Sequence, residues 1–217
     1  MEWKNDRVSL LNRKKRPFNA NHHEKNFRMN TFMNFAKAVF ATCLLMGLVS
    51  CASTHSHHGS HPQIEAAFGP EAGAEPLVLK VIATAKQSIR VSAYVLSSPA
   101  VLQALIAAKQ RGVDVQAVVD YGLNVANDSK GTRRNALAEL MKAGIAVRTS
   151  DSYRKMHDKF IIVDNQHVQT GSYNYAKSAN KNSENVLVVW HDPKLAGLYL
   201  KHWQSRFDAG TPFTPQP

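Results

Sequence analysis

The chain has 217 residues, of which 44% are hydrophobic and 20% are charged, and its formal net charge is +11. These proportions are those of a globular protein and exclude a disordered chain. Nine of the 27 Lys and Arg residues and three of the 16 acidic residues lie at or before Cys51. The 18 basic and 13 acidic residues that follow leave +5, so the remainder of the chain is only moderately basic.

The N-terminal segment predicts export. Lys37 precedes an apolar run over 38–49 that has the length of a signal-peptide core and is too short to span a membrane. The sequence LVSC at 48–51 resembles the bacterial lipobox, in which the cysteine is lipidated and becomes the first mature residue. We therefore expect residues 1–51 to be an N-terminal extension with a lipoprotein-type signal peptide. The protein would then be an exported, membrane-anchored lipoprotein of a bacterial cell envelope, facing the periplasm or the exterior. A plain secretory signal or a short membrane anchor is the alternative.

The rest of the chain divides into three parts. The segment 52–63, ASTHSHHGSHPQ, is small, polar and His-rich without periodicity, which indicates a flexible tether; a metal site is the alternative. The folded domain is expected over 64–210, and the Pro-rich end, 211–217, is expected to be a disordered tail. The two cysteines, Cys43 and Cys51, both precede the domain, so no disulfide framework is possible there.

The first half of the domain alternates between strands and helices. The pattern predicts a strand over 88–96, a helix over 99–111 before Gly112, a strand over 113–120, a helix over 132–143 before Gly144, and a strand over 145–149. Strands that alternate with helices of this length favour an α/β fold with right-handed crossovers.

The second half has a different pattern. Strands are predicted over 159–163 and 168–171 with a tight turn at 164–166 between them, followed by a strand over 184–190 and a closing helix over 193–207. The prediction is therefore an α/β fold with a mixed, mostly parallel β-sheet flanked by helices.

Polar side chains interrupt these last strands at short intervals. His157 and Lys159 are two residues apart and therefore share one face of a strand, as do Ser172 and Asn174 after the turn. Glu184 opens the next strand. We expect these five side chains to converge at one end of the sheet.

This set of side chains suits a phosphodiester, whose oxygens become more negative during displacement and need fixed donors. Lys159 offers a charge and Asn174 an N–H donor. A neutral His157 can attack phosphorus, and a carboxylate such as Glu184 can hold its other ring nitrogen.

The sequence HDKFIIVD at 157–164 fits H-x-K-x-x-x-x-D, GSYN follows at 171–174, and NSEN at 182–185. These motifs resemble the phospholipase D superfamily, in its single-motif bacterial endonuclease branch related to Nuc. The resemblance implies a phospholipase D-like fold over 64–210. It also implies a set of six catalytic residues, which are His157, Lys159, Asp164, Ser172, Asn174 and Glu184.

The resemblance also implies a role for each position. His157 would form a phosphohistidine, Lys159 and Asn174 would bind the phosphate, Ser172 would support the site, and Glu184 would orient the imidazole. Asp164 belongs to the motif, but seven residues separate it from His157, and this odd spacing places it off the catalytic face, so we expect a structural role.

Arg154 and Lys155, directly before the motif, are further candidates for substrate binding. With one motif copy, the resemblance implies a homodimer with the active site at its two-fold axis, and it implies no metal or other cofactor. A metal site of His157 with Asp158 or Asp164 is disfavoured because Lys159 would repel the cation.

The expected activity is metal-independent hydrolysis of DNA, with RNA as a further substrate and little sequence preference. Hydrolysis of phospholipids such as cardiolipin or phosphatidylcholine is the alternative, and a non-catalytic binder of nucleic acid is another. A lipid enzyme needs an apolar entrance beside its site, and no such cluster is visible in the predicted loops.

Overall fold

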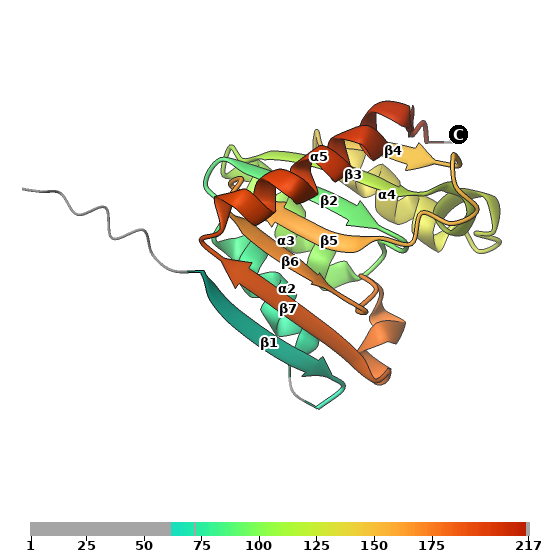
Figure 1. Ribbon diagram of the computed structural model, residues 1–217. Coiled ribbons are helices and arrows are strands. Elements are labelled where there is room, and N and C mark those ends of the chain that lie inside the picture. The colour runs from blue at the N-terminus through green and yellow to red at the C-terminus, as the bar shows by residue number, and fades with distance from the viewer. Residues whose placement is uncertain (1–61, 72, 216–217) are drawn as a thin grey trace, which may run out of the picture. The chain divides into compact units, whose positions relative to one another are not determined.

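The computed structural model describes residues 62–71 and 73–215 (Figure 1). The expected signal peptide with Cys51 and nearly all of the expected tether lie outside the described residues. Within those two ranges, no helix combines the length and the apolar character that crossing a membrane requires.

The described chain forms one eight-stranded sheet flanked by helices, which confirms the predicted α/β class. The strand order across the sheet is β1-β7-β6-β5-β2-β3-β4-β8. The elements are β1 (Gln63–Gly69), α2 (Ala74–Ala83), β2 (Ser88–Ala93), α3 (Pro99–Gln110), β3 (Asp114–Asp120), the π-helical segment η1 (Gly122–Ala126), α4 (Thr132–Lys142), β4 (Ala146–Ser150), β5 (Lys159–Val163), β6 (His167–Gly171), the 3-10 segment η2 (Lys177–Lys181), β7 (Glu184–Trp190), α5 (Pro193–Ala209) and β8 (Thr211–Pro212).

The sheet is mixed, but the expectation that it is mostly parallel was wrong. Only β2–β3 and β3–β4 are parallel among the pairings of the described strands; the other five are antiparallel. The turn between β5 and β6 is too short for a crossover, so this pair must be antiparallel. Asp164 and Asn165 in that turn have φ of 52° and 54°, a conformation that Asp and Asn tolerate and that tight hairpins require.

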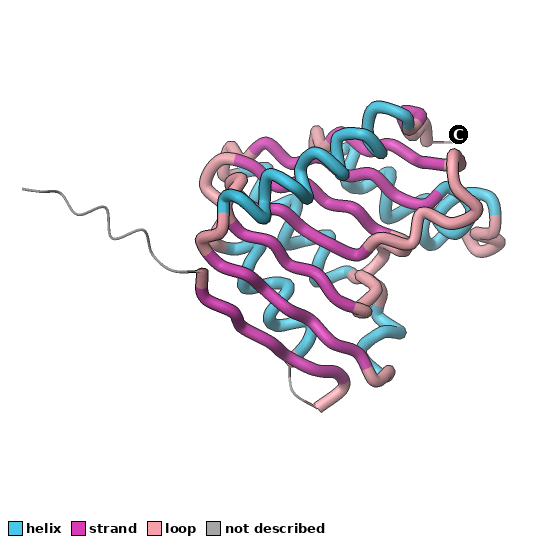
Figure 2. Tube along the Cα trace, in the orientation of Figure 1, coloured by secondary structure: helices cyan, strands magenta, loops and turns pink. Residues whose placement is uncertain are grey.

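Helices cover the two faces of the sheet unequally (Figures 1 and 2). α2, α3 and α4 lie on one face, and α5 alone crosses the other. The first core cluster packs residues of α2 to α4 against the sheet, and the second packs Trp203 of α5 against Phe160 and Ile162 of β5. α5 leaves the β1 side of its face open, where Ile64 and Phe68 are 69% and 57% exposed.

Two parts of the fold differ from the sequence predictions. No elements were predicted before residue 88, whereas the structure has β1 and α2 there. Pro76 lies in the first turn of α2, where proline is tolerated. The expected disordered tail was also wrong for its first residues. Thr211 and Pro212 pair with β4, and Phe213 is buried and donates its N–H to the carbonyl oxygen of Val147 at 2.9 Å. The free backbone groups of β4 and the burial of Phe213 in the core therefore order this segment.

Candidate active site

One edge of the sheet gathers the polar residues of the motif. β2, β3 and β4 end at this edge, whereas β5 and β7 begin there because they run antiparallel to their neighbours. His157 and Lys159 lie at the start of β5, Ser172 and Asn174 follow the end of β6, and Glu184 opens β7. The structure therefore places all five predicted side chains at one edge.

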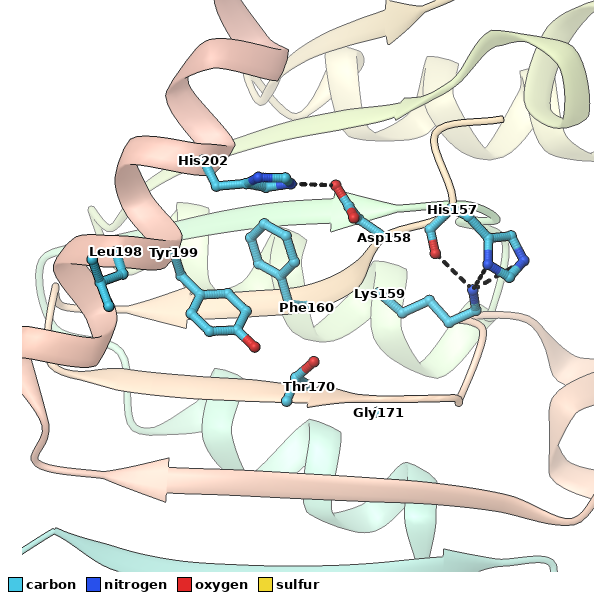
Figure 3. A pocket seen from close by; sticks show the side chains of 9 residues that line it. All are labelled: His157, Asp158, Lys159, Phe160, Thr170, Gly171, Leu198, Tyr199 and His202. Carbon is cyan, nitrogen blue, oxygen red and sulfur yellow. Dashed lines mark hydrogen bonds and ion pairs between the residues drawn. The ribbon is translucent and has the colours of Figure 1, made fainter. Parts of the chain in front are cut away.

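His157 and Lys159 are in direct contact (Figure 3). Lys159 Nζ lies 3.3 Å from Nδ1 and 3.4 Å from Nε2 of His157, and it donates to the carbonyl oxygen of His157 at 2.9 Å. The ring of Tyr94, directly after β2, lies 4.4 Å from the imidazole ring and 5.2 Å from Nζ. Lys159 is buried and His157 is exposed. A fixed ammonium group thus lies beside an accessible imidazole.

The surroundings bias both groups toward their uncharged forms. Partial desolvation by its neighbours, and then the positive charges of Lys159 and Lys155, lower the pKa of His157 below its ordinary value of 6.5, although the side chain is exposed. Burial also lowers the pKa of Lys159, while the carboxylates of Glu184 and Asp158 oppose that shift. The neutral imidazole keeps a lone pair available at neutral pH, which is the form that can attack phosphorus.

Ser172 and Glu184 form a second polar pair between β6 and β7. Ser172 Oγ donates to Oε2 of Glu184 at 2.5 Å and accepts from the Asn185 N–H at 3.0 Å. Asn182 donates to Oε1 of Glu184 at 3.1 Å. Gly171 permits this approach, because a Cβ there would fall on the carbonyl oxygen of Asn185. The glycine of the GSYN sequence is therefore required by the contact between the strands.

Glu184 does not orient the imidazole in the way that was expected. Its two carboxylate oxygens accept from Ser172 and Asn182, and within the described residues no hydrogen bond joins it to His157. The charge of Glu184 instead raises the pKa of Lys159, against the effect of burial. Asn174 follows the strand end, and its Oδ1 is buried without a hydrogen-bond partner in the described chain. Lys159 and Tyr94, rather than a carboxylate, contact the ring of His157.

Asp164 lies at the other end of β5 from His157. Its carboxylate accepts the backbone N–H groups of Lys86, Gln87 and Ser88 at 2.9, 2.8 and 2.8 Å. Burial raises the pKa of Asp164, but these three donors outweigh it, and the pKa is lowered overall. Asp164 therefore ties the β5–β6 turn to the start of β2, and it lies outside the site.

A pocket of about 480 Å³ opens beside His157 and Lys159 (Figure 3). One wall is apolar and consists of Phe160, Leu198 and Tyr199, with Leu198 64% exposed. The expectation that no apolar entrance exists is therefore wrong. It considered only the loops, whereas Leu198 and Tyr199 belong to α5, which the tertiary fold brings beside β5.

Asp158 and His202 were not predicted as a pair. Asp158 Oδ2 lies 2.9 Å from Nε2 of His202 on α5 and also accepts from Ser92 Oγ at 3.4 Å. Asp158 thus points away from His157 and toward α5 (Figure 3). In the part of the chain that the structure describes, no three His, Cys, Asp or Glu side chains are grouped to hold a metal ion. Asp158 and Asp164 are both engaged elsewhere, so the alternative metal site gains no support.

The loop before β5 carries the two basic candidates for substrate binding. Arg154 and Lys155 are both exposed, and the positive charge of Lys155 acts on His157. Tyr94 and Asp120, by contrast, contact this region but were missed. Tyr94 directly follows the apolar strand β2, and Asp120 ends the apolar strand β3. A polar residue at the end of a buried strand was the signal that could have identified them.

Comparison with known proteins agrees with this geometry. The family described as "Cardiolipin synthase, PLD-like domain" matches residues 78–207. A phospholipase D from Rickettsia bellii is 36% identical over 148 residues, which are 68% of this chain and 70% of that protein. A mitochondrial cardiolipin hydrolase from Canis lupus familiaris is 29% identical over 166 residues, covering 70% of this chain and 63% of that protein. The crystal structure of the phospholipase D family member Nuc from Salmonella typhimurium is 43% identical, with a TM-score of 0.67, and the match covers 70% of this chain and 98% of that one.

The fold and the site together define an enzyme that hydrolyses phosphoric diesters. The chain belongs to the phospholipase D-like family and resembles Nuc.

Proposed function

We propose that the protein cleaves phosphodiesters through a covalent phosphohistidine at His157 and without a metal ion. The observation that carries this proposal is the buried Lys159 Nζ, 3.3 Å from the His157 ring. The phosphoryl oxygens gain negative charge as the nucleophile attacks, and a fixed cation stabilises that charge. Lys159 thereby supplies the charge stabilisation that a metal ion supplies in other phosphodiesterases.

The reaction has two displacements. A ring nitrogen of neutral His157 forms a bond to phosphorus while the bond to the leaving oxygen breaks, and that oxygen takes a proton from a general acid. Water then attacks the phosphohistidine, the P–N bond breaks, and a general base accepts the proton of the water. Asn174 donates to the phosphate, and the Ser172–Glu184 pair holds β6 against β7 beside it.

Trapping the intermediate tests this mechanism. Rapid quenching with a ³²P-labelled phosphodiester in base should leave label on the peptide that contains His157, and acid should remove it. His157→Ala should lose both label and turnover, while His191→Asn, at the opposite edge, should keep both. Label that persists in His157→Ala would contradict the mechanism.

We also propose that two copies of the chain form one active site. A general acid must protonate the leaving oxygen while His157 is the nucleophile, and the sequence holds one motif copy. His202, the other imidazole at the pocket, is bonded to Asp158. A two-fold axis beside His157 would bring the partner subunit's His157 to the leaving oxygen.

The open face of the sheet supports this assembly. Ile64 and Phe68 are exposed on β1, and Ala66 between them lies in register with Leu187 of β7. An apolar strip of this kind on an edge strand suits contact with a second copy.

Sedimentation should show a homodimer for a soluble chain that starts at about residue 52. Phe68→Glu should give an inactive monomer, whereas Lys142→Glu on the opposite helical face should remain an active dimer. An active monomer would contradict the shared site, and a dimeric Phe68→Glu would exclude this strip as the interface. Binding of the wild-type chain to vesicles through the strip would indicate a membrane contact instead.

We propose DNA as the substrate, with RNA as a further one. Exposed basic residues lie after η1, before β5 and in η2, in segments that join strands at the edge of the sheet that holds the site: Lys130, Arg154, Lys155, Lys177 and Lys181. Such side chains bind backbone phosphates without reading bases, so we expect little sequence preference and strong weakening of binding by salt.

Phospholipid is the second candidate. The apolar wall of Phe160, Leu198 and Tyr199 beside the catalytic pair suits the glycerol and acyl part of a lipid. Two relatives carry the names phospholipase D and cardiolipin hydrolase.

Parallel assays distinguish these substrates. The purified protein is incubated with supercoiled plasmid and, separately, with cardiolipin and phosphatidylcholine vesicles at low salt and neutral pH. For a nuclease, Arg154→Ala/Lys155→Ala should slow plasmid nicking, and Leu198→Ser should leave it unchanged. Rapid headgroup release with intact plasmid would overturn the assignment to DNA while leaving the catalytic mechanism in place.

A further inference from the structure

A buried carboxylate adjoins the nucleophile but takes no part in the chemistry above. Asp120 ends β3 and is 3% exposed. Its Oδ2 accepts the Met156 N–H at 2.8 Å, and its Oδ1 accepts the Leu123 N–H at 2.7 Å. Because Met156 directly precedes His157, this carboxylate holds the backbone one residue away from the imidazole.

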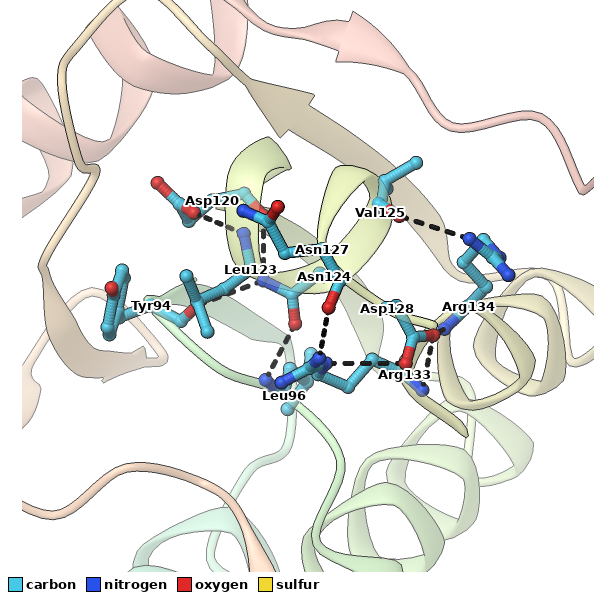
Figure 4. Close-up of polar contacts among 10 residues, drawn as sticks. All are labelled: Tyr94, Leu96, Asp120, Leu123, Asn124, Val125, Asn127, Asp128, Arg133 and Arg134. Atoms are coloured by element: carbon cyan, nitrogen blue, oxygen red, sulfur yellow. Dashed lines mark hydrogen bonds and ion pairs between the residues drawn. The ribbon is translucent and has the colours of Figure 1, made fainter. Parts of the chain in front are cut away.

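The same network also holds Tyr94 (Figure 4). The ring of Tyr94 packs against His157. Asn124 of η1 is fully buried and donates to the carbonyl oxygens of Asp120 at 2.7 Å and Tyr94 at 2.9 Å. Its Oδ1 accepts the Leu96 N–H at 3.1 Å. π-helical segments of this kind are frequent at functional sites. The end of β2, the end of β3 and the chain before His157 are thus joined by one set of buried hydrogen bonds.

Asp120 differs from the other buried aspartate of this region. Asp128 is 2% exposed, pairs with Arg133 Nε at 3.5 Å, and accepts the N–H groups of Arg133 and Arg134 at the start of α4. Asp120 forms no ion pair within the described residues. A buried carboxylate without a cation is unfavourable for stability unless hydrogen bonds compensate, and here the N–H groups of Met156 and Leu123 supply them.

We propose that Asp120 is a positioning residue that sets the imidazole of His157 against Lys159 and Tyr94 for attack on phosphorus. The proposal rests on the proposed function, because it concerns the orientation of the nucleophile. The charged groups that act on His157 are Lys159 and Lys155, which lower its pKa, and Asp120 and Asp158, which raise it. Neutralising Asp120 therefore lowers the pKa of His157 further, so the titration reports that this carboxylate lies near the ring, while kcat reports the orientation of the ring.

Asp120→Asn tests this role, with Asp128→Asn as the matched control. Asparagine keeps the size of the side chain but presents an amide to one of the two backbone N–H groups. The measurements are kcat and KM on bis(p-nitrophenyl) phosphate and an NMR titration of the His157 ring in the intact protein. For Asp120→Asn we expect kcat to fall about tenfold with KM changed by less than about twofold. The His157 titration should move to lower pH.

The Asp128→Asn control distinguishes an effect on the orientation of the His157 ring from an effect on the stability of the fold. Asp128→Asn should lower the melting temperature without moving kcat or the His157 titration. Equal losses in both variants, or an unmoved titration with wild-type kcat in Asp120→Asn, would overturn the proposal. If Asp120→Asn does not fold, Asp120→Ser replaces it in the same measurements, and wild-type kcat in that variant would overturn the proposal. An active His157→Ala would instead refute the proposed function, while the titration of His157 in Asp120→Asn would still report the charge of Asp120 near the ring.

Discussion

Lys159 Nζ lies 3.3 Å from Nδ1 of His157, and the ring of Tyr94 packs against both groups. This contact gives the site two properties at once. In the proposed mechanism the ammonium group would stabilise negative charge on a bound phosphoryl group, and it disfavours protonation of the imidazole proposed to attack. This one contact therefore serves both halves of the proposed first step, the neutral imidazole and the charge on the phosphoryl group.

Replacing Lys159 by methionine should remove catalysis while keeping the fold. Methionine retains most of the buried stem but not the charge, so we expect turnover of bis(p-nitrophenyl) phosphate to fall at least about a hundredfold. The circular dichroism spectrum should match that of the wild type. Lys142→Met on α4 is the control and should keep full activity. Activity above about a tenth of wild type would contradict the role of Lys159.

The pH dependence of kcat/KM should change when the charge of Lys155 is removed. The neutral form of His157 is the proposed nucleophile and its pKa is lowered, so the acid limb of kcat/KM should lie below pH 6.5. Lys155→Ala removes a cation that lowers this pKa, so the limb should move to higher pH. The shift should shrink at high salt, because Lys155 is exposed. A limb that does not move would show that Lys155 does not act on the imidazole.

Chelation should leave activity unchanged. Lys159 and Asn174 are proposed to stabilise the charge that a metal ion would otherwise stabilise, so turnover should be the same with and without excess EDTA. The measurement is the initial rate after dialysis against the chelator. Loss of activity that Mg²⁺ or Zn²⁺ restores would refute the metal-independent mechanism.

Asp164→Asn should lower stability rather than activity. The folded pKa of Asp164 is lowered, so its contribution is present above the unfolded pKa of about 3.8 and is lost as pH falls through the folded value. Asparagine tolerates the positive φ but accepts the three N–H groups less strongly, so we expect about 1–3 kcal/mol less stability at pH 7. Urea unfolding at pH 7 and near pH 2 should show a difference in unfolding free energy between the wild type and Asp164→Asn that narrows in acid. A difference in unfolding free energy that does not change with pH would show that the carboxylate charge is not the cause of the stabilisation.

We propose that Cys51, outside the described residues, anchors the protein to the bacterial envelope. Cys51→Ser in the full chain should abolish lipid attachment and release the protein from the membrane fraction. The check is fractionation with metabolic labelling by a radioactive fatty acid, and Cys43→Ser is the control that should remain attached. A Cys51→Ser protein that stays bound and labelled would refute the lipobox prediction.

Much of the site was predictable because its residues are close in sequence. The spacing of two between His157 and Lys159 indicated a shared face, as the pleat of a strand requires. Asp164 was correctly expected to be structural, but it lies outside the site because it is at the other end of β5, not because of its odd spacing. The helices ended near Gly112 and Gly144, and the turn at 164–166 formed a hairpin, because these signals act within a few residues.

Other features depended on which strands became neighbours. Glu184 bonded to Ser172 rather than to His157, Asp158 met His202 of α5, and Asp120 reached the N–H before His157. The apolar wall beside the site also depended on α5, which lies far from β5 in sequence. Periodicity sets the direction of a side chain relative to its own strand or helix, but the packing of the whole chain sets which elements lie side by side. The local sequence therefore determined the identity and facing of the catalytic pair, whereas the tertiary structure alone decided the residues that hold and surround it.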